Sequence, residues 1–490
     1  MQKIKSSLTD HLRNCTKEMM KELNVSGAAV AIVKDGEIVL SEGFGYRDVE
    51  NKKPVTPSTL FAIGSSTKAF GTLSLSLLAQ QRKFDWDETV QTYLPTFSLH
   101  DPLISSQTTA RDLASHRSGV SRHELLWYQS SFTRKEIMEK IKYLELDAPF
   151  RTSFLYNNLM YVTMSYMVEK ITNQTWEQYV SEHILQPLHM ENTNFSVTTS
   201  QENDNHALPY IEKDKDTVKI PLRNIDTVGA AGCINSTIED MAKWILFHLN
   251  QGKAGEHELI TPNLLQQMYE PHIPIPDDPL LSTSETALTC YGLGWFISAY
   301  RGYKVIHHGG NIDGFSALVS FIPEENIGLV ILTNAGTTLL PTYLANQIYD
   351  EILELDAIDW HKRSAEDTAK FKEIMKELDK PFPQVKETSP THELKEYTGI
   401  FEHPAYGKIE VDIQNDLLHL KWGSLHTEMK HHHYNMFTVK WDISYSEMNL
   451  LIAYEMETEG KLSQLKLNLS PMLSAKPIVF TKLDDTDTTS

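Results

Sequence analysis

A serine and a lysine three positions apart, Ser65 and Lys68, begin the part of the sequence whose residue types could do chemistry. A serine hydroxyl is a weak nucleophile at neutral pH, and an amine one helical turn away could take its proton. The apolar run 69–78 predicts a buried helix, in which loss of water lowers the pKa of the lysine toward that of a general base. By itself the spacing is also typical of a capped helix with a solvated lysine.

A second polar pair, Tyr156 and Asn158, precedes the apolar stretch 159–162. In a turn that leads into a helix, this pair can direct a phenol and a carboxamide into one cleft. The alternative is a core tyrosine followed by an asparagine that caps the helix.

A third segment, His307–Asn311, contains two histidines, two glycines and an asparagine before the strand-like stretch 316–322. Glycines on a strand let the backbone of a substrate approach closely, because no side chain blocks the strand edge. Adjacent histidines could instead bind a metal, but neighbours on a strand point to opposite faces, and no further ligand follows at a suitable spacing. We therefore expect no metal site and no cofactor.

Taken in this order, the three segments resemble the serine β-lactamase and penicillin-binding-protein superfamily. The resemblance is strongest to its class C branch of β-lactamase-like peptidases and esterases, in which Tyr-x-Asn is typical and His-x-Gly often replaces Lys-Thr-Gly. Segments 112–120, 229–241 and 291–295 also resemble motifs of this group, so the similarity covers approximately residues 10 to 350.

The resemblance implies a covalent mechanism with three catalytic residues. Ser65 would be acylated, and Lys68 and Tyr156 would share the proton transfers. The backbone N–H groups of Ser65 and Asn311 would form the oxyanion hole. Deacylation would depend on Tyr156, Lys68 and His308, because no glutamate is placed like the one that activates water in class A enzymes.

The resemblance also implies a substrate-binding set. Asn158 would hydrogen-bond the substrate amide and Lys68, Gly310 would belong to the strand that receives the substrate, and His308 would replace the lysine that supports the tyrosine and recognises a carboxylate. An imidazole titrates near neutrality, so recognition of a carboxylate would be weaker or pH-dependent. This replacement favours an aminopeptidase, endopeptidase or esterase over an efficient β-lactamase or a strict carboxypeptidase.

These residues need a scaffold of both helices and strands. A helix near 8–23, a hairpin of 28–33 with 38–44, helices over about 68–249 and strands at 292–299, 304–306, 317–322 and 327–333 predict an α/β (α+β) β-lactamase/transpeptidase-like sandwich. It would have an antiparallel sheet with helices on both faces and an all-helical subdomain. We expect this hydrolase domain at 1–355, a helical connector and linker at 356–390, and a lipocalin-like antiparallel β-barrel at 391–490.

The segment 125–150 enters just before Tyr156 and has two interpretations. It could be a cap that narrows the cleft, with Trp127 and Tyr128 as apolar contacts for the substrate, or an ordinary packed helical pair.

Composition narrows the class of protein. The 490 residues carry a formal charge of -20, which argues against nucleic acid or an anionic membrane as a partner. No apolar run is long enough for a membrane span, and no secretory signal is visible. The expected location is therefore cytoplasmic for the chain as given, or extracytoplasmic if a signal was removed. Three widely spaced cysteines do not suggest a disulfide framework.

The function expected from the sequence is a serine hydrolase that forms an acyl-enzyme with a small peptide, amide or ester, with peptides that contain D-amino acids as the leading substrates. A carboxylesterase or a weak β-lactamase is the alternative within enzymes, and β-lactams are possible acylating ligands. A penicillin-binding sensor or scaffold is the alternative outside enzymes. A homo-oligomer is possible.

Overall fold

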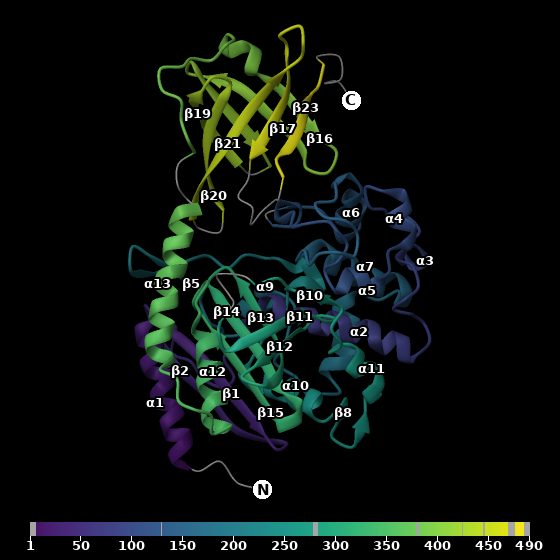
Figure 1. The fold of residues 1–490 in the computed structure, drawn as a ribbon, viewed down its shortest axis with the longest axis vertical. Coiled ribbons are helices and arrows are strands. Elements are labelled where there is room, and N and C mark those ends of the chain that lie inside the picture. Colours follow the sequence, from purple (N-terminus) through teal and green to yellow (C-terminus); the bar gives the residue numbers. More distant parts are fainter. Residues whose placement is uncertain are drawn as a thin grey trace.

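The chain folds into a large α/β domain and a β-barrel, joined by the helix α13 (Trp360–Leu378). In Figure 1 the barrel lies above the larger domain, and α13 runs along one side of that domain toward it. This computed structural model describes residues 6–128, 130–277, 283–378, 382–423, 425–443, 446–468 and 476–484.

The larger domain is organised around one antiparallel sheet. Its strands are, in spatial order, β10 (Ile273–Pro274), β11 (Thr286–Tyr291), β12 (Phe296–Tyr300), β13 (Tyr303–Ile312), β14 (Phe315–Ile322), β15 (Ile327–Thr333), β1 (Gly27–Lys34), β2 (Glu37–Asp48) and β3 (Lys53–Pro54). Strand β1 pairs with β15, with Ala28 opposite Thr333, so the first and last strands of the domain meet inside the sheet. All residues of β14 and β15 are buried, because helices cover both faces.

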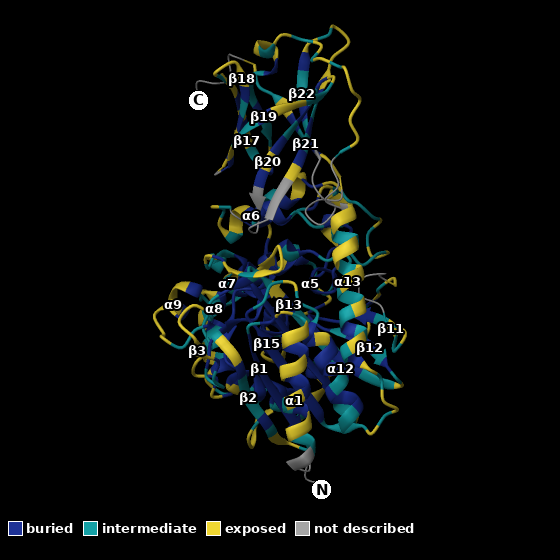
Figure 2. Cartoon of the chain, turned by 90° about the vertical axis from the view of Figure 1, so that its left-hand side faces the viewer, coloured by how far each residue is buried: buried dark blue, intermediate teal, exposed yellow. Residues whose placement is uncertain are grey.

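Two apolar layers hold these helices on the sheet. The outer layer contains α1 (Ser6–Glu22) and α12 (Leu340–Ile352), whose side chains pack with those of β1 and β15. The inner layer contains α10 (Ile238–Leu249) and α2 (Lys68–Gln80). Figure 2 shows the buried residues concentrated in and around the sheet, with the exposed face of α1 turned to solvent.

A helical region lies on the same side of the sheet as α2 and α10. Its helices are α3 (Val90–Tyr93), α4 (Pro102–Gln107), α5 (Ala110–Ala114), α6 (Arg134–Lys140), α7 (Asn158–Thr172), α8 (Trp176–Val180), α9 (Val197–Gln201) and α11 (Pro262–Gln267). Three short strand pairs accompany them: β4 (Phe61–Ala62) with β7 (Asn235–Ser236), β5 (Tyr210–Lys213) with β6 (Asp216–Lys219), and β8 (Lys253–Ala254) with β9 (His257–Glu258).

The second body is a closed antiparallel barrel. Its strands are β16 (Gly399–His403), β17 (Gly407–Gln414), β18 (Leu417–Trp422), β19 (Leu425–His433), β20 (Met436–Ile443), β21 (Ser446–Met456), β22 (Leu462–Asn468) and β23 (Ile478–Lys482). β23 pairs with β16 and closes the barrel, so none of its described strands is a free sheet edge. The predicted fold class, a sandwich with helices on both faces plus a C-terminal barrel, is confirmed.

One predicted strand is placed differently. Residues 292–299 were expected to be extended, but Gly292–Trp295 form the turn between β11 and β12. Gly294 has φ +79, and a Cβ on it would lie 3.0 Å from the carbonyl oxygen of Lys68. This glycine is therefore needed because the turn packs directly against the beginning of α2.

The barrel contacts the larger domain beside the predicted cap. Tyr406, in the turn between β16 and β17, lies with its hydroxyl 2.7 Å from Nδ1 of His123, and Lys140 of α6 donates to the carbonyl of Pro404 at 3.5 Å. Lys476 donates to the carbonyl of Leu146 at 3.0 Å. Residues 130–150 of the predicted cap thus lie beside the barrel, as Figure 1 shows for α6.

None of the helices in the described ranges is both long and apolar enough to cross a membrane.

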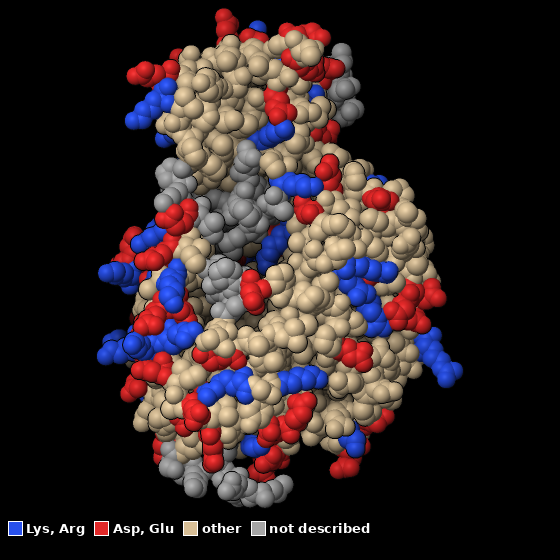
Figure 3. Space-filling view, in the orientation of Figure 1, with Lys and Arg blue, Asp and Glu red and all other residues tan. Residues whose placement is uncertain are grey.

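Figure 3 shows Lys and Arg side chains interspersed with Asp and Glu over the visible face.

The approach of β13 to the short helix η1 (Gly64–Thr67) requires glycine. A Cβ on Gly310 would lie 1.9 Å from the carbonyl oxygen of Ile63, and one on Gly64 would lie 2.9 Å from the amide nitrogen of Asn311. The two backbones are therefore in direct contact, which brings the segment of Ser65 and the glycine-containing strand together.

We expect Gly310→Ala to lower the free energy of unfolding by about 1–3 kcal/mol, because the added methyl group must push β13 away from η1. Urea unfolding followed by circular dichroism measures the change. Gly309→Ala is the matched control, since a Cβ there meets its nearest atom, the Ala317 carbonyl oxygen, at 3.6 Å. Equal stability of the two variants would contradict this account.

Candidate active site

Ser65 lies in η1, immediately before the buried helix α2 that begins with Lys68. The serine is partly exposed, whereas the lysine is completely buried. Because η1 continues directly into α2, one turn separates the two side chains, and Nζ of Lys68 lies 3.1 Å from Oγ of Ser65. The predicted alternative of a solvated lysine is therefore wrong.

The amine of Lys68 has two further partners. It donates to Oδ1 of Asn158 and to the carbonyl oxygen of Ala231, each at 2.8 Å. Burial lowers its pKa well below the ordinary value, while the charge of Glu124 raises it and that of Arg122 lowers it. A neutral amine has two hydrogens and one lone pair, so two oxygen acceptors would leave the lone pair for the Ser65 hydroxyl.

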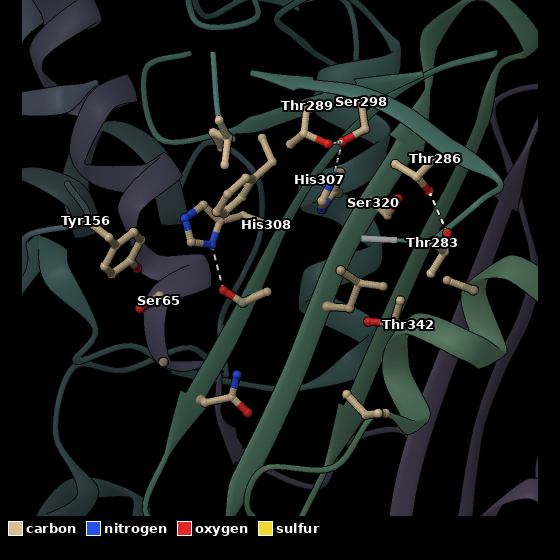
Figure 4. Close-up of a pocket in the computed structure, with 18 of the residues that line it drawn as sticks. Ser65, Tyr156, Thr283, Thr286, Thr289, Ser298, His307, His308, Ser320 and Thr342 are labelled. Carbon is tan, nitrogen blue, oxygen red and sulfur yellow. Dashed lines mark hydrogen bonds between the residues drawn. The ribbon is translucent and has the colours of Figure 1, made fainter. Parts of the chain in front are cut away.

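Tyr156 completes the group. The Nζ atom of Lys68 lies 4.8 Å from the centre of the Tyr156 ring. Burial raises the pKa of this phenol above its ordinary value, and a hydrogen bond with Ser65 and the charge of Arg122 act in the opposite direction. Because its pKa is raised, the phenol carries its proton at neutral pH. Figure 4 shows Tyr156 and Ser65 close together at one end of the cavity, with His308 beside them.

Asn158 is the first residue of α7, and its side chain faces the site. Its Oδ1 accepts from Lys68, and its Nδ2 lies 3.0 Å from Oε2 of Glu124. The cap of α7 is the preceding residue, Asn157, whose side chain accepts from the Leu159 amide. The capping role that was an alternative for Asn158 thus belongs to its neighbour.

His308 occupies β13 but does not bond to Tyr156; their ring centres are 6.4 Å apart. Its Nδ1 lies 2.6 Å from the Gly309 carbonyl, so Nδ1 carries the hydrogen, and Nε2 accepts from the Tyr291 hydroxyl at 2.9 Å. Burial, with the nearby charge of Lys68, lowers the pKa of His308 to about 3. The expected titration near neutrality is therefore wrong.

These side chains open into a cavity of about 1130 Å³. At its catalytic end the lining includes Ser65, Tyr156, Asn158 and His308, and the apolar residues there include Phe154, Ile225, Val228 and Phe296. The cavity continues past β12 and β13 toward Ser298, Ser320 and Thr342, as Figure 4 shows. Within the described ranges, no group of three or more His, Cys, Asp or Glu side chains could hold a metal ion.

Comparison with known families decides the classification. A family profile described as Beta-lactamase matches residues 12–351, well over half of the chain. The chain belongs to the beta-lactamase family. Residues 383–482 match a second profile, described as a domain of unknown function (DUF3471). This second match covers the barrel.

Individual relatives agree with this family. The chain is 29% identical over 434 residues to the protein named Unguisins hydrolase ungD' of Aspergillus campestris, covering 82% of this chain and 78% of that protein. Among solved structures, an octameric penicillin-binding protein homologue from Pyrococcus abyssi has a TM-score of 0.62 at 21% identity, covering 97% and 100% of the two chains. FmtA from Staphylococcus aureus has a TM-score of 0.57 at 21% identity, covering 72% and 91%. This member of the beta-lactamase family is a serine hydrolase.

Two predicted substrate contacts lie elsewhere in this beta-lactamase-family structure. Tyr128 is 6% exposed and does not line the cavity, because its hydroxyl donates to Asp313 at 2.7 Å. Gly310 is buried against η1, and its neighbours Gly309 and Asn311 line the cavity. Trp127 does line the cavity, with its indole N–H donating to Glu124.

Sequence reasoning missed Glu124, Arg122 and Tyr291. Arg122 and Glu124 follow the 112–120 segment by two and four residues, and both side chains line the cavity. Tyr291 begins the 291–295 segment, whose resemblance to a motif of the group does not by itself indicate a site residue. The signal in the sequence that could have identified these three residues is their position within or just after the motif segments.

We expect His308 to remain neutral between about pH 5 and 8, since its folded pKa of about 3 lies far below that range. ¹⁵N-detected NMR of the imidazole, assigned with a His308→Gln variant, should show one Nδ1–H tautomer that does not titrate over these pH values. A midpoint near pH 6.5 would contradict the burial of this ring.

Proposed function

We propose that this serine hydrolase acts through an acyl-enzyme on small peptides, amides or esters. The observation that carries the proposal is the contact set of Lys68, a buried amine with oxygen acceptors at 2.8 Å on two sides and the Ser65 hydroxyl at 3.1 Å on the third. A neutral amine in this position is a general base for a serine nucleophile.

In the acylation step, Lys68 takes the proton of Ser65 while Oγ forms a bond to the substrate carbonyl carbon. The oxyanion that develops is stabilised by the backbone N–H groups of Ser65 and Asn311. The close packing of η1 against β13 supports this assignment, since it holds both amides near the nucleophile.

Tyr156 donates its proton to the leaving amine or alcohol as the carbonyl–heteroatom bond breaks, and Lys68 returns a proton to the phenol. In deacylation the neutral amine of Lys68 takes a proton from water as the water oxygen bonds to the ester carbon, with Tyr156 sharing the proton transfer. The bond between that carbon and Oγ then breaks, and the proton passes to Oγ of Ser65. The raised pKa of Tyr156 favours the phenol form that the first of these transfers requires.

Among possible substrates, we favour peptides that contain D-amino acids. The resemblance to peptidases of the class C branch supports this choice, and so does the apolar lining near Ser65. A neutral His308 provides no fixed positive charge for a C-terminal carboxylate, so strict carboxypeptidase activity is disfavoured. Asn158, Asn311 and Trp127 are the proposed contacts with the substrate. Ester hydrolysis and weak turnover of β-lactams are the alternatives at the same site.

Two structural proposals accompany this function. Residues 1–355 form the catalytic unit, 356–390 the connector and 391–490 a lipocalin-like barrel unit. The chain also forms a homo-oligomer, a proposal supported by the octameric state named for the Pyrococcus abyssi protein of similar fold.

We expect a fluorophosphonate probe to label the protein, and Ser65→Ala to abolish the labelling. Ser76→Ala is the matched control, because Ser76 lies on α2, the helix that directly continues η1, and its Oγ has no hydrogen-bond partner among the described residues. In-gel fluorescence and peptide mass spectrometry identify the modified residue. Labelling that persists in Ser65→Ala would refute the assignment of Ser65 as the nucleophile. Labelling with a fluorescent penicillin that is never released would favour a penicillin-binding sensor.

We expect para-nitrophenyl esters and para-nitroanilides of D-amino acids to be hydrolysed faster than the same derivatives of L-amino acids. Both should be hydrolysed far faster than a chromogenic cephalosporin. Initial rates over matched D and L pairs provide the comparison. Rapid cephalosporin hydrolysis would overturn the inference from the neutral His308.

A further inference from the structure

The strand β13 supplies no positive charge to the catalytic group. His308 is neutral, and its two nitrogens are engaged by Gly309 and Tyr291. A phenol that exchanges protons with an amine is nevertheless sensitive to any charge nearby, because the buried site screens electrostatic interactions poorly. The charge that acts on Tyr156 must therefore come from another element.

Arg122 supplies such a charge. Its guanidinium carbon lies 4.8 Å from the centre of the Tyr156 ring, within the usual range of a cation–π contact. The side chain is 41% exposed and lines the cavity. It lies in the loop that follows the 112–120 segment, not on β13.

Glu124 is the counter-ion of this arginine and has a second connection to the site. Nη1 of Arg122 lies 3.2 Å from Oε1 of Glu124. The same carboxylate accepts from Nδ2 of Asn158 at 3.0 Å and from the indole N–H of Trp127. Since the amide nitrogen of Asn158 is bound to Glu124, its oxygen must face Lys68, which is the orientation observed at 2.8 Å.

The other ionisable groups around Lys68 are neutral. His116 has a pKa well below its ordinary value and His308 one of about 3, in both cases chiefly because of burial. Burial likewise raises the pKa values of the phenols that face the site, Tyr156, Tyr161 and Tyr291. Among the residues that the structure describes, the charges that act on Lys68 are those of Glu124 and Arg122.

We propose that Arg122 and Glu124 are a charged positioning pair that sets the pH range of acylation, with Arg122 as the cation beside Tyr156 and Glu124 as the carboxylate that orients Asn158. This inference rests on the proposed function, because it assigns the pair to the Ser65–Lys68–Tyr156 chemistry. In this chain Arg122, in the loop before η2 (Glu124–Leu126), and Glu124, the first residue of η2, give the tyrosine the electrostatic support that the resemblance implied for β13.

The two charges act on Lys68 with opposite sign. Acylation requires the neutral amine, so its rate rises as the pH increases through the Lys68 pKa. Arg122 lowers that pKa, and its removal shifts the acidic limb of the rate profile to higher pH. Glu124 raises it, and its removal shifts the same limb to lower pH. Loss of Arg122 also raises the Tyr156 pKa.

The test measures the second-order rate constant for fluorophosphonate labelling of Ser65 from about pH 4 to 9 in the full-length protein. The acidic limb is the part of this profile in which the rate constant rises with pH. We expect Arg122→Met to shift the acidic limb upward by about 0.5 to 1 pH unit and Glu124→Gln to shift it downward by a similar amount. Arg122→Lys should return the limb toward the wild-type position, and the double variant Arg122→Met/Glu124→Gln should lie between the two single variants.

Arg82→Met is the control for loss of one positive charge. Arg82 is exposed beyond the end of α2, about 20 Å along the helix from Lys68, where salt screens its effect. A purely structural role would lower the plateau rate of both site variants without moving the limb. Limbs that do not move, or that move in the same direction, would overturn the inference while labelling persists. Absence of Ser65 labelling in the wild-type protein would instead refute the proposed function.

Discussion

The burial of one amine is the constraint on which the rest of this structure depends. An ionised lysine inside a protein loses several kcal/mol of hydration, so the neutral form is favoured unless a carboxylate compensates. Lys68 receives two oxygen acceptors instead, from Asn158 and Ala231. The helix α2 can hold the amine there because it is buried for most of its length. The chemistry of Ser65 is therefore a result of packing.

Holding this amine requires segments that are distant in the sequence. The carbonyl of Ala231 comes from the last residue of η5 (Asp226–Ala231), the carboxamide comes from the first residue of α7, and β13 packs against η1 through glycine backbone. The barrel adds a further layer. Tyr406 contacts His123, which directly precedes Glu124, so the barrel adjoins the loop that carries the charged pair.

The sequence predicted those parts of the site that depend on local spacing. Ser65 and Lys68 meet because one turn of helix separates them, and the fold class followed from the order of helical and strand periodicities. The state of His308 could not be predicted, because it depends on burial and on Tyr291, which reaches it across the sheet. Tyr128 was misassigned for a related reason: its neighbour Asp313 is far away in the sequence.

The pairing of β1 with β15 has a consequence for how the molecule is made. During synthesis the N-terminal hairpin emerges from the ribosome early, but its partner, which ends at Thr333, follows about three hundred residues later. Until then β1 has an open edge inside an incomplete sheet, and such edges recruit other chains. Long-range pairing of this kind is slow to form. The nascent enzyme thus passes through a vulnerable interval, and its nucleophile acquires its strand β13 only near the end of it.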